Sequence, residues 1–273
     1  MKILILSACS RFRTPAFLNH RYFAECHEYE YIYEFLPLQV NIQSRYLYKL
    51  YVLAKYANFT SFDFIFWVDD DVLFVDFDSK MPLERILIER EKYHLIFSES
   101  PTHPKYKFKC WINSGNFFFK PSTIVKEFFD KCTNTCLDQV RHVWNRDKYG
   151  PFFGGDQEIM THLLNDASSP APPFTRTNFK LFNTRPYHYG VLENLILIHF
   201  TAGSKALQMK KFAKNHHFTN NALLPTDVLN NYLRTCDPLL TIPLRVKRHH
   251  FDIWTLWSFK LIFLALLKIV LLK

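Results

Sequence analysis

The sequence predicts a single α/β domain built on a mostly parallel central sheet, and three observations favour this class. Strand-like apolar runs alternate with helix-like runs along most of the 273 residues. The run at 64–68, Phe-Ile-Phe-Trp-Val, is typical of a strand that is covered on both faces, as in the centre of a parallel sheet. Aromatic residues make up 17% of the chain and there are only 6 glycines, which indicates one densely packed core.

The expected elements follow from local patterns. Residues 2–6 are expected to form the first strand, because four apolar residues before Ser7 are too few for the core of a signal peptide. Thr14 and Pro15 favour the start of a helix that runs toward residue 25. Further strands are expected at 29–36, 62–68, 95–98, 116–120 and 195–199. Further helices are expected at 44–55, 82–92, from Ser122 through Phe129, at 156–164 and at 223–233, and the proline-rich stretch 168–173 is expected to be a loop.

Three aspartates, Asp69, Asp70 and Asp71, follow the strand at 62–68 directly. Buried carboxylates at the end of such a strand need a counter-charge, and the carboxyl ends of parallel strands are where ligands bind. Hard oxygen ligands suit Mg²⁺ or Mn²⁺, and such a cation can bridge to a phosphate. The stretch therefore predicts a divalent metal site, although a solvated acidic turn is the alternative interpretation.

Three more polar segments lie at the edges of apolar runs, where loops and sites collect. They are 112–116 (Ile-Asn-Ser-Gly-Asn), 154–157 (Gly-Gly-Asp-Gln) and 199–205 (His-Phe-Thr-Ala-Gly-Ser-Lys). Each has an ordinary interpretation when it is taken alone. His199 could be a hydrogen-bonded core histidine, Gly154-Gly155 a turn, and Lys205 a solvated surface charge.

The four polar segments, together with residues 7–9, 19–24 and 27–31 and the helix that contains Lys49, resemble a retaining glycosyltransferase of the GT-A type. Their order and approximate spacing over about residues 1–210 are most similar to family 34, the galactosyl-, mannosyl- and xylosyltransferase group. The resemblance implies a Rossmann-like GT-A catalytic domain over residues 1–240. It also implies metal-dependent transfer of a hexose or pentose from a nucleotide sugar, a UDP-sugar, to a glycan or lipid-linked acceptor, with retention of configuration.

The resemblance also assigns roles to the candidate residues. Asp69, Asp71 and His199 are the expected ligands of a Mn²⁺ or Mg²⁺ that bridges the two phosphates, with contact to the ribose or a water as an alternative for Asp69. Asp156, Gln157 and Lys205 are the expected catalytic residues: the first two hold the donor sugar, and Lys205 reaches the diphosphate. The expected donor-binding residues are Ser7 and Cys9 at the nucleoside, Asn113, Ser114 and Gly115 at the sugar, and Asp69, Asp70 and Lys205.

The net charge and the C-terminal sequence indicate association with a membrane. The net charge of +9 favours anionic partners. A basic cluster at 245–250 precedes the 21 residues 253–273, which are largely apolar but include Lys260 and Lys268. Each lysine would cost about 2.5–3.5 kcal/mol at the centre of a bilayer, so an amphipathic helix lying on an anionic membrane is favoured over a spanning one. Residues 241–273 are therefore the expected membrane-association segment, although packing against the core is the alternative.

Two other functions remain open at this stage, a metal-dependent nucleotidyltransferase and a non-enzymatic basic membrane-bound scaffold. Nucleic acid is not an expected partner, because the chain lacks the patterned basic and aromatic motifs of RNA- and DNA-binding modules. The six cysteines show no paired metal-ligand spacing and are expected to be free thiols in a reducing compartment. The expected location is therefore the cytoplasm, at the inner face of a membrane.

Overall fold

The structure of the protein is a computed structural model. It describes residues 1–9, 14–35, 42–168, 170–201 and 203–235. The proposed membrane-association segment 241–273, with the helix expected over 253–273, lies outside the described residues. Among the described helices, none is both long and apolar enough to cross a membrane.

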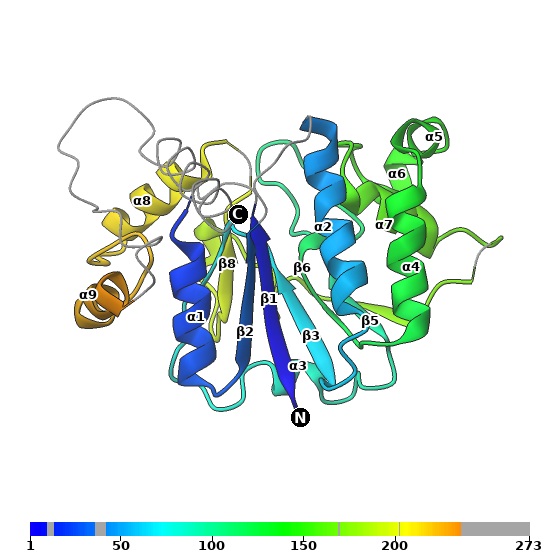
Figure 1. The fold of residues 1–273 in the computed structure, drawn as a ribbon. Coiled ribbons are helices and arrows are strands. Elements are labelled where there is room, and N and C mark those ends of the chain that lie inside the picture. Colours follow the sequence, from blue (N-terminus) through cyan, green and yellow to red (C-terminus); the bar gives the residue numbers. More distant parts are fainter. Residues whose placement is uncertain (10–13, 36–41, 169, 202, 236–273) are drawn as a thin grey trace, which may run out of the picture.

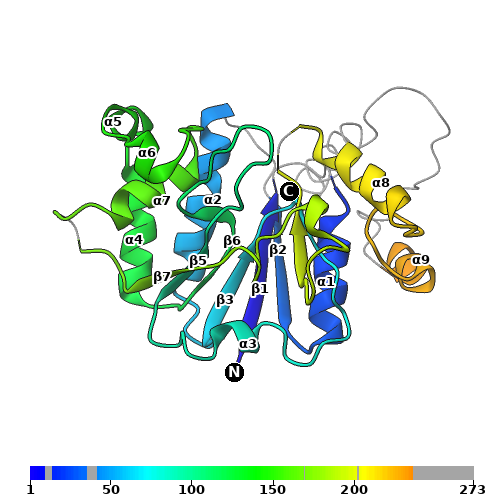
Figure 2. The same ribbon diagram turned by 180° about the vertical axis from the view of Figure 1, so that it is seen from behind.

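Six strands form the central sheet in the order β2-β1-β3-β6-β5-β7 (Figures 1 and 2). Their bounds are β1 (Ile3–Cys9), β2 (Glu30–Phe35), β3 (Phe64–Val68), β5 (Leu95–Ser98), β6 (Asn113–Phe119) and β7 (Phe174–Thr177). The pairs β1–β2, β1–β3 and β5–β7 are parallel, whereas β6 is antiparallel to both β3 and β5. The predicted α/β class with a mostly parallel sheet is thus confirmed, but β3 has one antiparallel neighbour.

A second, two-stranded sheet pairs β4 (Val72–Phe74) with β8 (Leu197–His199) in antiparallel register. The register sets His199 directly opposite Val72, and therefore next to Asp71. All six residues of this ribbon are buried. Pairing of the segment after the aspartates with the last predicted strand brings two distant polar segments of the chain to one place.

Helices cover both faces of the central sheet. Their bounds are α1 (Ala16–Cys26), α2 (Ile42–Tyr56), α3 (Glu84–Leu87), α4 (Thr123–Asn134), α5 (Leu137–His142), α6 (Arg146–Tyr149), α7 (Asp156–Leu164), α8 (Lys205–Asn215) and α9 (Thr226–Thr235), with a 3₁₀ turn η1 (Pro186–His188). On one face α2, α4 and α7 pack on Trp67 and Phe117. On the other face α1, α3 and the β4–β8 ribbon pack on Phe66 and Phe118 (Figure 1).

Several predicted elements differ from the observed ones. The helix expected over 82–92 is only the single turn α3, because the chain leaves helical geometry at Ile88 (φ −48°, ψ 135°) and takes a positive φ at Glu89. Ser122 occupies the N-cap position of α4, but its hydroxyl donates to Lys120 O and makes no capping bond. The strand expected at 116–120 begins earlier, at Asn113, so the polar segment 113–116 is part of β6.

Candidate active site

The three aspartates lie in the short link between β3 and β4, at the carboxyl end of β3. Each aspartate backbone is held by a different part of the chain. The hydrogen bonds run from Asp69 N to Gly115 O (2.7 Å), from Thr14 Oγ1 to Asp70 O (2.5 Å) and from Phe200 N to Asp71 O (2.8 Å). These bonds fix the backbone from which the carboxylates project, which favours a preorganised site over a mobile acidic turn.

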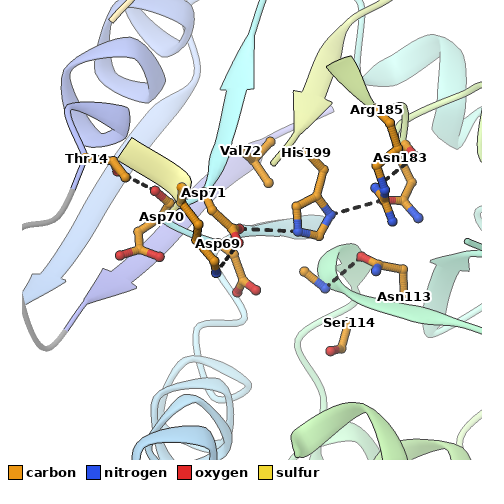
Figure 3. A network of polar contacts seen from close by, with 12 residues as sticks. Thr14, Asp69, Asp70, Asp71, Val72, Asn113, Ser114, Asn183, Arg185 and His199 are labelled. Atoms are coloured by element: carbon orange, nitrogen blue, oxygen red, sulfur yellow. Dashed lines mark hydrogen bonds and ion pairs between the residues drawn. The ribbon is translucent and has the colours of Figure 1, made fainter. Parts of the chain in front are cut away.

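Asp69, Asp71 and His199 come together as the sequence led us to expect. One ligand atom from each residue lies within 4.8 Å of the others. Asp71 Oδ1 is 3.3 Å from His199 Nε2, and both side chains are buried (Figure 3). Within the described parts of the chain, this Oδ1 is buried without a hydrogen-bond donor. Two carboxylates and an imidazole around an unsatisfied oxygen fit a divalent cation, and no such ion is part of the structure.

Lys205, the first residue of α8, forms an ion pair with Asp71 Oδ2. Burial would raise the pKa of Asp71, but the ammonium group of Lys205 helps to hold it below its usual range. Burial would likewise lower the pKa of Lys205, yet Asp71 and the neighbouring aspartates raise it. Both groups are therefore charged at neutral pH, and Lys205 is a cation held at the edge of the cluster.

Lys49 is a buried cation that our sequence analysis did not assign to the site. Its Nζ lies 3.1 Å from Asp69 Oδ1 and 3.1 Å from Asp156 Oδ2, and it donates a hydrogen bond to Ser114 O. It also lies 5.2 Å from the centre of the Trp67 ring. Burial would lower the pKa of Lys49, but Asp156 and Asp69 outweigh this effect and raise it. Lys49 thus joins the aspartate cluster to the start of α7.

Asp69 is the most accessible of the three candidate ligands, with 30% of its side chain exposed. Besides the contact with Lys49, its Oδ1 accepts a hydrogen bond from Trp67 Nε1 at 2.7 Å. Burial raises the pKa of Asp69 to about 6, an effect that Lys49 opposes and Asp71 reinforces. Trp67 and Lys49 thus hold one oxygen of the Asp69 carboxylate in place.

His199 is surrounded by polar groups on the side that faces away from Asp71. Its Nδ1 lies 3.2 Å from Asn183 Oδ1, and Asn183 is in turn bonded to Arg185 (Figure 3). Burial lowers the pKa of His199 to about 4, with Asp71 opposing and Arg185 adding to the effect. The imidazole is therefore neutral at physiological pH, which is the form that binds a metal.

The segment predicted to line the sugar pocket borders the same cluster. Asn113 Oδ1 accepts from Gly115 N at 3.0 Å, and the carbonyl of Ser114 accepts from Lys49. Gly115 lies against the His199 ring: a Cβ added there would be 2.9 Å from His199 Nε2. That distance is too short for a side chain, so the close approach of β6 to β8 requires glycine at this position.

Asp156 and Gln157 open α7 beside this segment. Asp156 is buried and ion-paired to Lys49, whereas Gln157 is half-buried and hydrogen-bonded to the Cys110 thiol. Gly155 N, just before the helix, donates to Glu158 Oε2 at 2.8 Å, which fixes the first turn. The predicted catalytic pair is thus connected to the aspartates through one lysine.

The residues predicted for the nucleoside lie at the end of β1. Ser7 is fully buried, and its hydroxyl is 2.8 Å from His20 Nδ1. Cys9 is buried too and accepts a hydrogen bond from Tyr33 OH at 2.6 Å. Asp70 is half-buried and near enough to Lys205 to raise the pKa of that lysine. All five cysteines in the described residues are free thiols, as expected.

The structure therefore brings the aspartates, the 113–115 segment, Asp156, His199 and Lys205 together, whereas the described contact of Gln157 is with Cys110. It adds Lys49, Asn183 and Arg185, which sequence reasoning did not select. The sequence did contain a signal for Lys49: a lysine flanked by the buried Leu50 and Leu53 on an apolar helix face needs a counter-charge. Asn183 and Arg185 had none, since they lie in a segment without periodicity.

Comparison with known proteins gives three results. A family model described as nucleotide-diphospho-sugar transferase matches residues 58–222. A solved glycosyltransferase involved in the glycosylation of the major capsid of PBCV-1 is similar in fold, with a TM-score of 0.59, 14% identity, and coverage of 78% of this chain and 100% of that one. The glycosyltransferase GlyE of Streptococcus pneumoniae TIGR4 has a TM-score of 0.46, 12% identity, and coverage of 86% and 64%. No curated protein matches the chain significantly in sequence.

Proposed function

The chain belongs to the family of nucleotide-diphospho-sugar transferases and is a glycosyltransferase, and from this premise we propose a metal-dependent enzyme of the retaining GT-A type that resembles family 34. Its donor is a UDP-sugar that carries a hexose or pentose, and its acceptor is a glycan or a lipid-linked precursor. Family membership favours sugar transfer over the nucleotidyltransferase and scaffold alternatives.

One observation supports the proposal most strongly. Asp69, Asp71 and His199 present oxygen, oxygen and nitrogen atoms to one another, and Asp71 Oδ1 has no donor within the described residues. Two carboxylates with one imidazole suit Mn²⁺, with Mg²⁺ as the harder alternative. When bound, the ion supplies a Lewis acid for the charge that develops on the leaving diphosphate.

The protein residues around this cluster suit the rest of the reaction. Cleavage of the bond between the anomeric carbon and the β-phosphate oxygen leaves negative charge on the nucleoside diphosphate, and Lys205 offers a charged ammonium group there. In this proposal Asp156, which is ion-paired to Lys49, and Gln157 orient the donor sugar and stabilise positive charge on its ring. We assign Asn113, Ser114 and Gly115 to the donor sugar and Ser7, Cys9 and Asp70 to the nucleoside; the support is the position of the first three beside His199 and Lys49.

Retention follows if the acceptor attacks from the face that the leaving group departs from. The acceptor oxygen then bonds to the anomeric carbon as its proton passes to the departing phosphate oxygen, so no separate base is needed. Asp156 is buried, and its carboxylate is held in an ion pair with the buried Lys49. This supports its role in binding the sugar.

The decisive experiment measures binding of UDP by calorimetry with and without Mn²⁺. We expect clear binding with Mn²⁺ and little in EDTA, because the aspartates would otherwise repel the diphosphate. Asp71→Asn, which keeps the side-chain shape but removes the charge, should abolish the Mn²⁺-dependent binding and the sugar transfer while circular dichroism stays unchanged. Equal affinity for UDP in EDTA would refute the metal-bridge model.

We further propose that residues 1–240 form the catalytic domain and that residues 241–273 attach it to the inner face of an anionic membrane from the cytoplasm. The support is sequence alone: the basic cluster 245–250 followed by the largely apolar stretch 253–273. A lipid-linked acceptor would be presented at such a surface.

A further inference from the structure

Behind His199, on the side away from the aspartates, lies a chain of three buried polar side chains. Asn183 Oδ1 is 3.2 Å from His199 Nδ1 and accepts a hydrogen bond from Arg185 Nη1 at 2.7 Å (Figure 3). All three residues are buried, and Asn183 is completely inaccessible to solvent. Hydrogen bonds in such an environment are strong and have few alternatives.

The orientation of the Asn183 amide is fixed from both ends. Its Nδ2 donates to the carbonyl of Glu99 at 2.8 Å, and a carbonyl can only accept. Its Oδ1 accepts from Arg185, and a guanidinium can only donate. A flipped amide would place two acceptors against each other at Glu99 and two donors against each other at Arg185. The oxygen of Asn183 must therefore face His199.

An amide oxygen in this position determines the tautomer of the imidazole. Since Asn183 Oδ1 can only accept, His199 Nδ1 must carry the hydrogen of the neutral ring. The lone pair then lies on Nε2, which is the nitrogen 3.3 Å from Asp71 Oδ1. Without a cation these two acceptors face each other, which agrees with the absence of a hydrogen-bond donor to Asp71 Oδ1 within the described residues.

Arg185 keeps this arrangement in place. Only 7% of it is exposed, and the described residues offer its guanidinium no carboxylate: its Nη1 donates to Asn183 O at 3.2 Å, to Asn183 Oδ1 and to Thr184 O at 3.4 Å. Burying a cation without a direct ion pair is costly. The cost is tolerable where the cation performs a function, and here it is the donor that prevents the Asn183 amide from flipping.

We propose that Asn183 and Arg185 are positioning residues that hold His199 in the Nδ1–H tautomer, so that its Nε2 lone pair points into the metal site. This inference rests on the proposed function, because it assumes that His199 binds a metal. Histidine ligands commonly donate their other ring N–H to such a partner, and loss of that partner typically weakens metal binding by about 10–100-fold.

Three variants test the assignment. Asn183→Leu removes the acceptor at nearly constant volume, and Asn183→Asp keeps an acceptor for His199 Nδ1–H. Asn19→Leu is the matched control, because Asn19 is equally buried and its hydrogen bonds go to the backbone of Phe74 and Ala222 and not to His199 or Arg185. The readouts are Mn²⁺ affinity in the presence of saturating UDP and the tautomer of His199 from long-range ¹H–¹⁵N NMR, assigned by comparison with His199→Gln.

In the wild-type protein His199 Nε2 should show the ¹⁵N shift of an unprotonated ring nitrogen even without metal. Asn183→Leu should lose this signature and bind Mn²⁺ about 10–100-fold more weakly. Asn183→Asp should retain the signature and near wild-type affinity, and so should the control. Should Asn183→Leu fail to fold, Arg185→Met provides a second test, since it leaves the amide held only by its bond to Glu99 O and should allow a fraction of the second tautomer.

The outcomes separate this inference from the proposed function. Absence of saturable Mn²⁺ binding to the wild-type protein would overturn the metal site and, with it, the assignment. A proton on His199 Nε2 in the wild-type protein, or equal Mn²⁺ affinities for wild type and Asn183→Leu, would overturn the positioning role alone.

Discussion

Replacement of Lys49 by methionine is the most direct test of how the site is held together. Lys49 Nζ is 3.1 Å from both Asp69 Oδ1 and Asp156 Oδ2, and the lysine is buried. Methionine keeps most of the side-chain length but removes the ammonium group that lies over the Trp67 and Phe117 rings. The substitution therefore removes one positive charge and leaves two carboxylates and the Ser114 carbonyl without their common donor.

The expected loss of stability follows from burial. Removal of one partner of a buried ion pair costs about 3–5 kcal/mol, because the remaining charge is left uncompensated. The side chain of Asp69 is 30% exposed, so water solvates part of its charge and the lower end applies, about 3 kcal/mol. For a domain of this size each kcal/mol lowers the melting temperature by about 2–4 °C, which predicts a drop of about 6–12 °C.

Thermal unfolding followed by circular dichroism measures this drop, and Lys126→Met is the control. Lys126 forms an ion pair with Asp130 at 2.5 Å, but both side chains are well exposed (37% and 44%). Exposed pairs contribute about 0–1 kcal/mol, so the control should melt within about 4 °C of the wild type. If Lys49→Met melted no lower than the control, Lys49 would not be a buried counter-charge.

Lys49→Met should also respond more strongly to metal than the wild-type protein. With the lysine gone, Asp69 and Asp156 repel each other, so a cation bound at Asp69 relieves more unfavourable charge. Saturating Mn²⁺ and UDP should therefore raise the melting temperature of the variant by more than that of the wild type. A smaller increase would show that Lys49 supports the metal site instead of competing with the metal for Asp69.

Four further predictions concern other parts of the chain. Burial lowers the pKa of His20 from 6.5 to about 4, so between these pH values the unfolded chain binds a proton that the folded protein does not. The free energy of unfolding should therefore fall by about 3 kcal/mol as the pH drops through this window. Urea unfolding of His20→Gln should show a shallower fall over the same pH range. Gly115→Ala should displace the His199 ring and weaken Mn²⁺ binding about tenfold or more in calorimetry, with unchanged circular dichroism. The product formed from an α-linked donor should be α-linked by NMR of its anomeric proton, and a β-linkage would make Asp156 a candidate base. Truncation before Arg245 should leave donor hydrolysis near normal but abolish sedimentation with anionic vesicles, and loss of activity would show that the tail belongs to the catalytic fold.

Local patterns predicted some elements well. The strand at 95–98 and the helix at 156–164 have the predicted bounds, because the first is a short buried apolar run and the second begins at an aspartate after two glycines. Local patterns did not predict the direction of the strands. A fully apolar strand such as β3 looks the same with parallel or antiparallel neighbours, so the antiparallel placement of β6 could not be anticipated.

Prediction of the site was limited in the same way, because strand pairing, which local patterns do not reveal, brings its residues together. The aspartates were visible because three charges follow a buried strand, whereas His199 joined them only through the resemblance of the whole set of segments. What places it there is the β4–β8 register, which pairs three-residue strands that carry no periodic signal. Asn183 and Arg185 could not be predicted from the sequence, because their role depends on their hydrogen-bond partners in the fold and not on their spacing along the chain.

The charges of the assembled site explain why metal and nucleotide should bind together. The carboxylates of Asp69, Asp71 and Asp156 are balanced by the cations of Lys49, Lys205 and Arg185, of which the first two are in direct ion pairs. A divalent ion alone would add uncompensated positive charge to this buried cluster, and a diphosphate alone would meet the aspartates. The two together are nearly neutral, and Lys205 can then exchange its contact with Asp71 for one with phosphate. The protein's own ion pairs therefore favour binding of the metal–diphosphate complex over binding of either component.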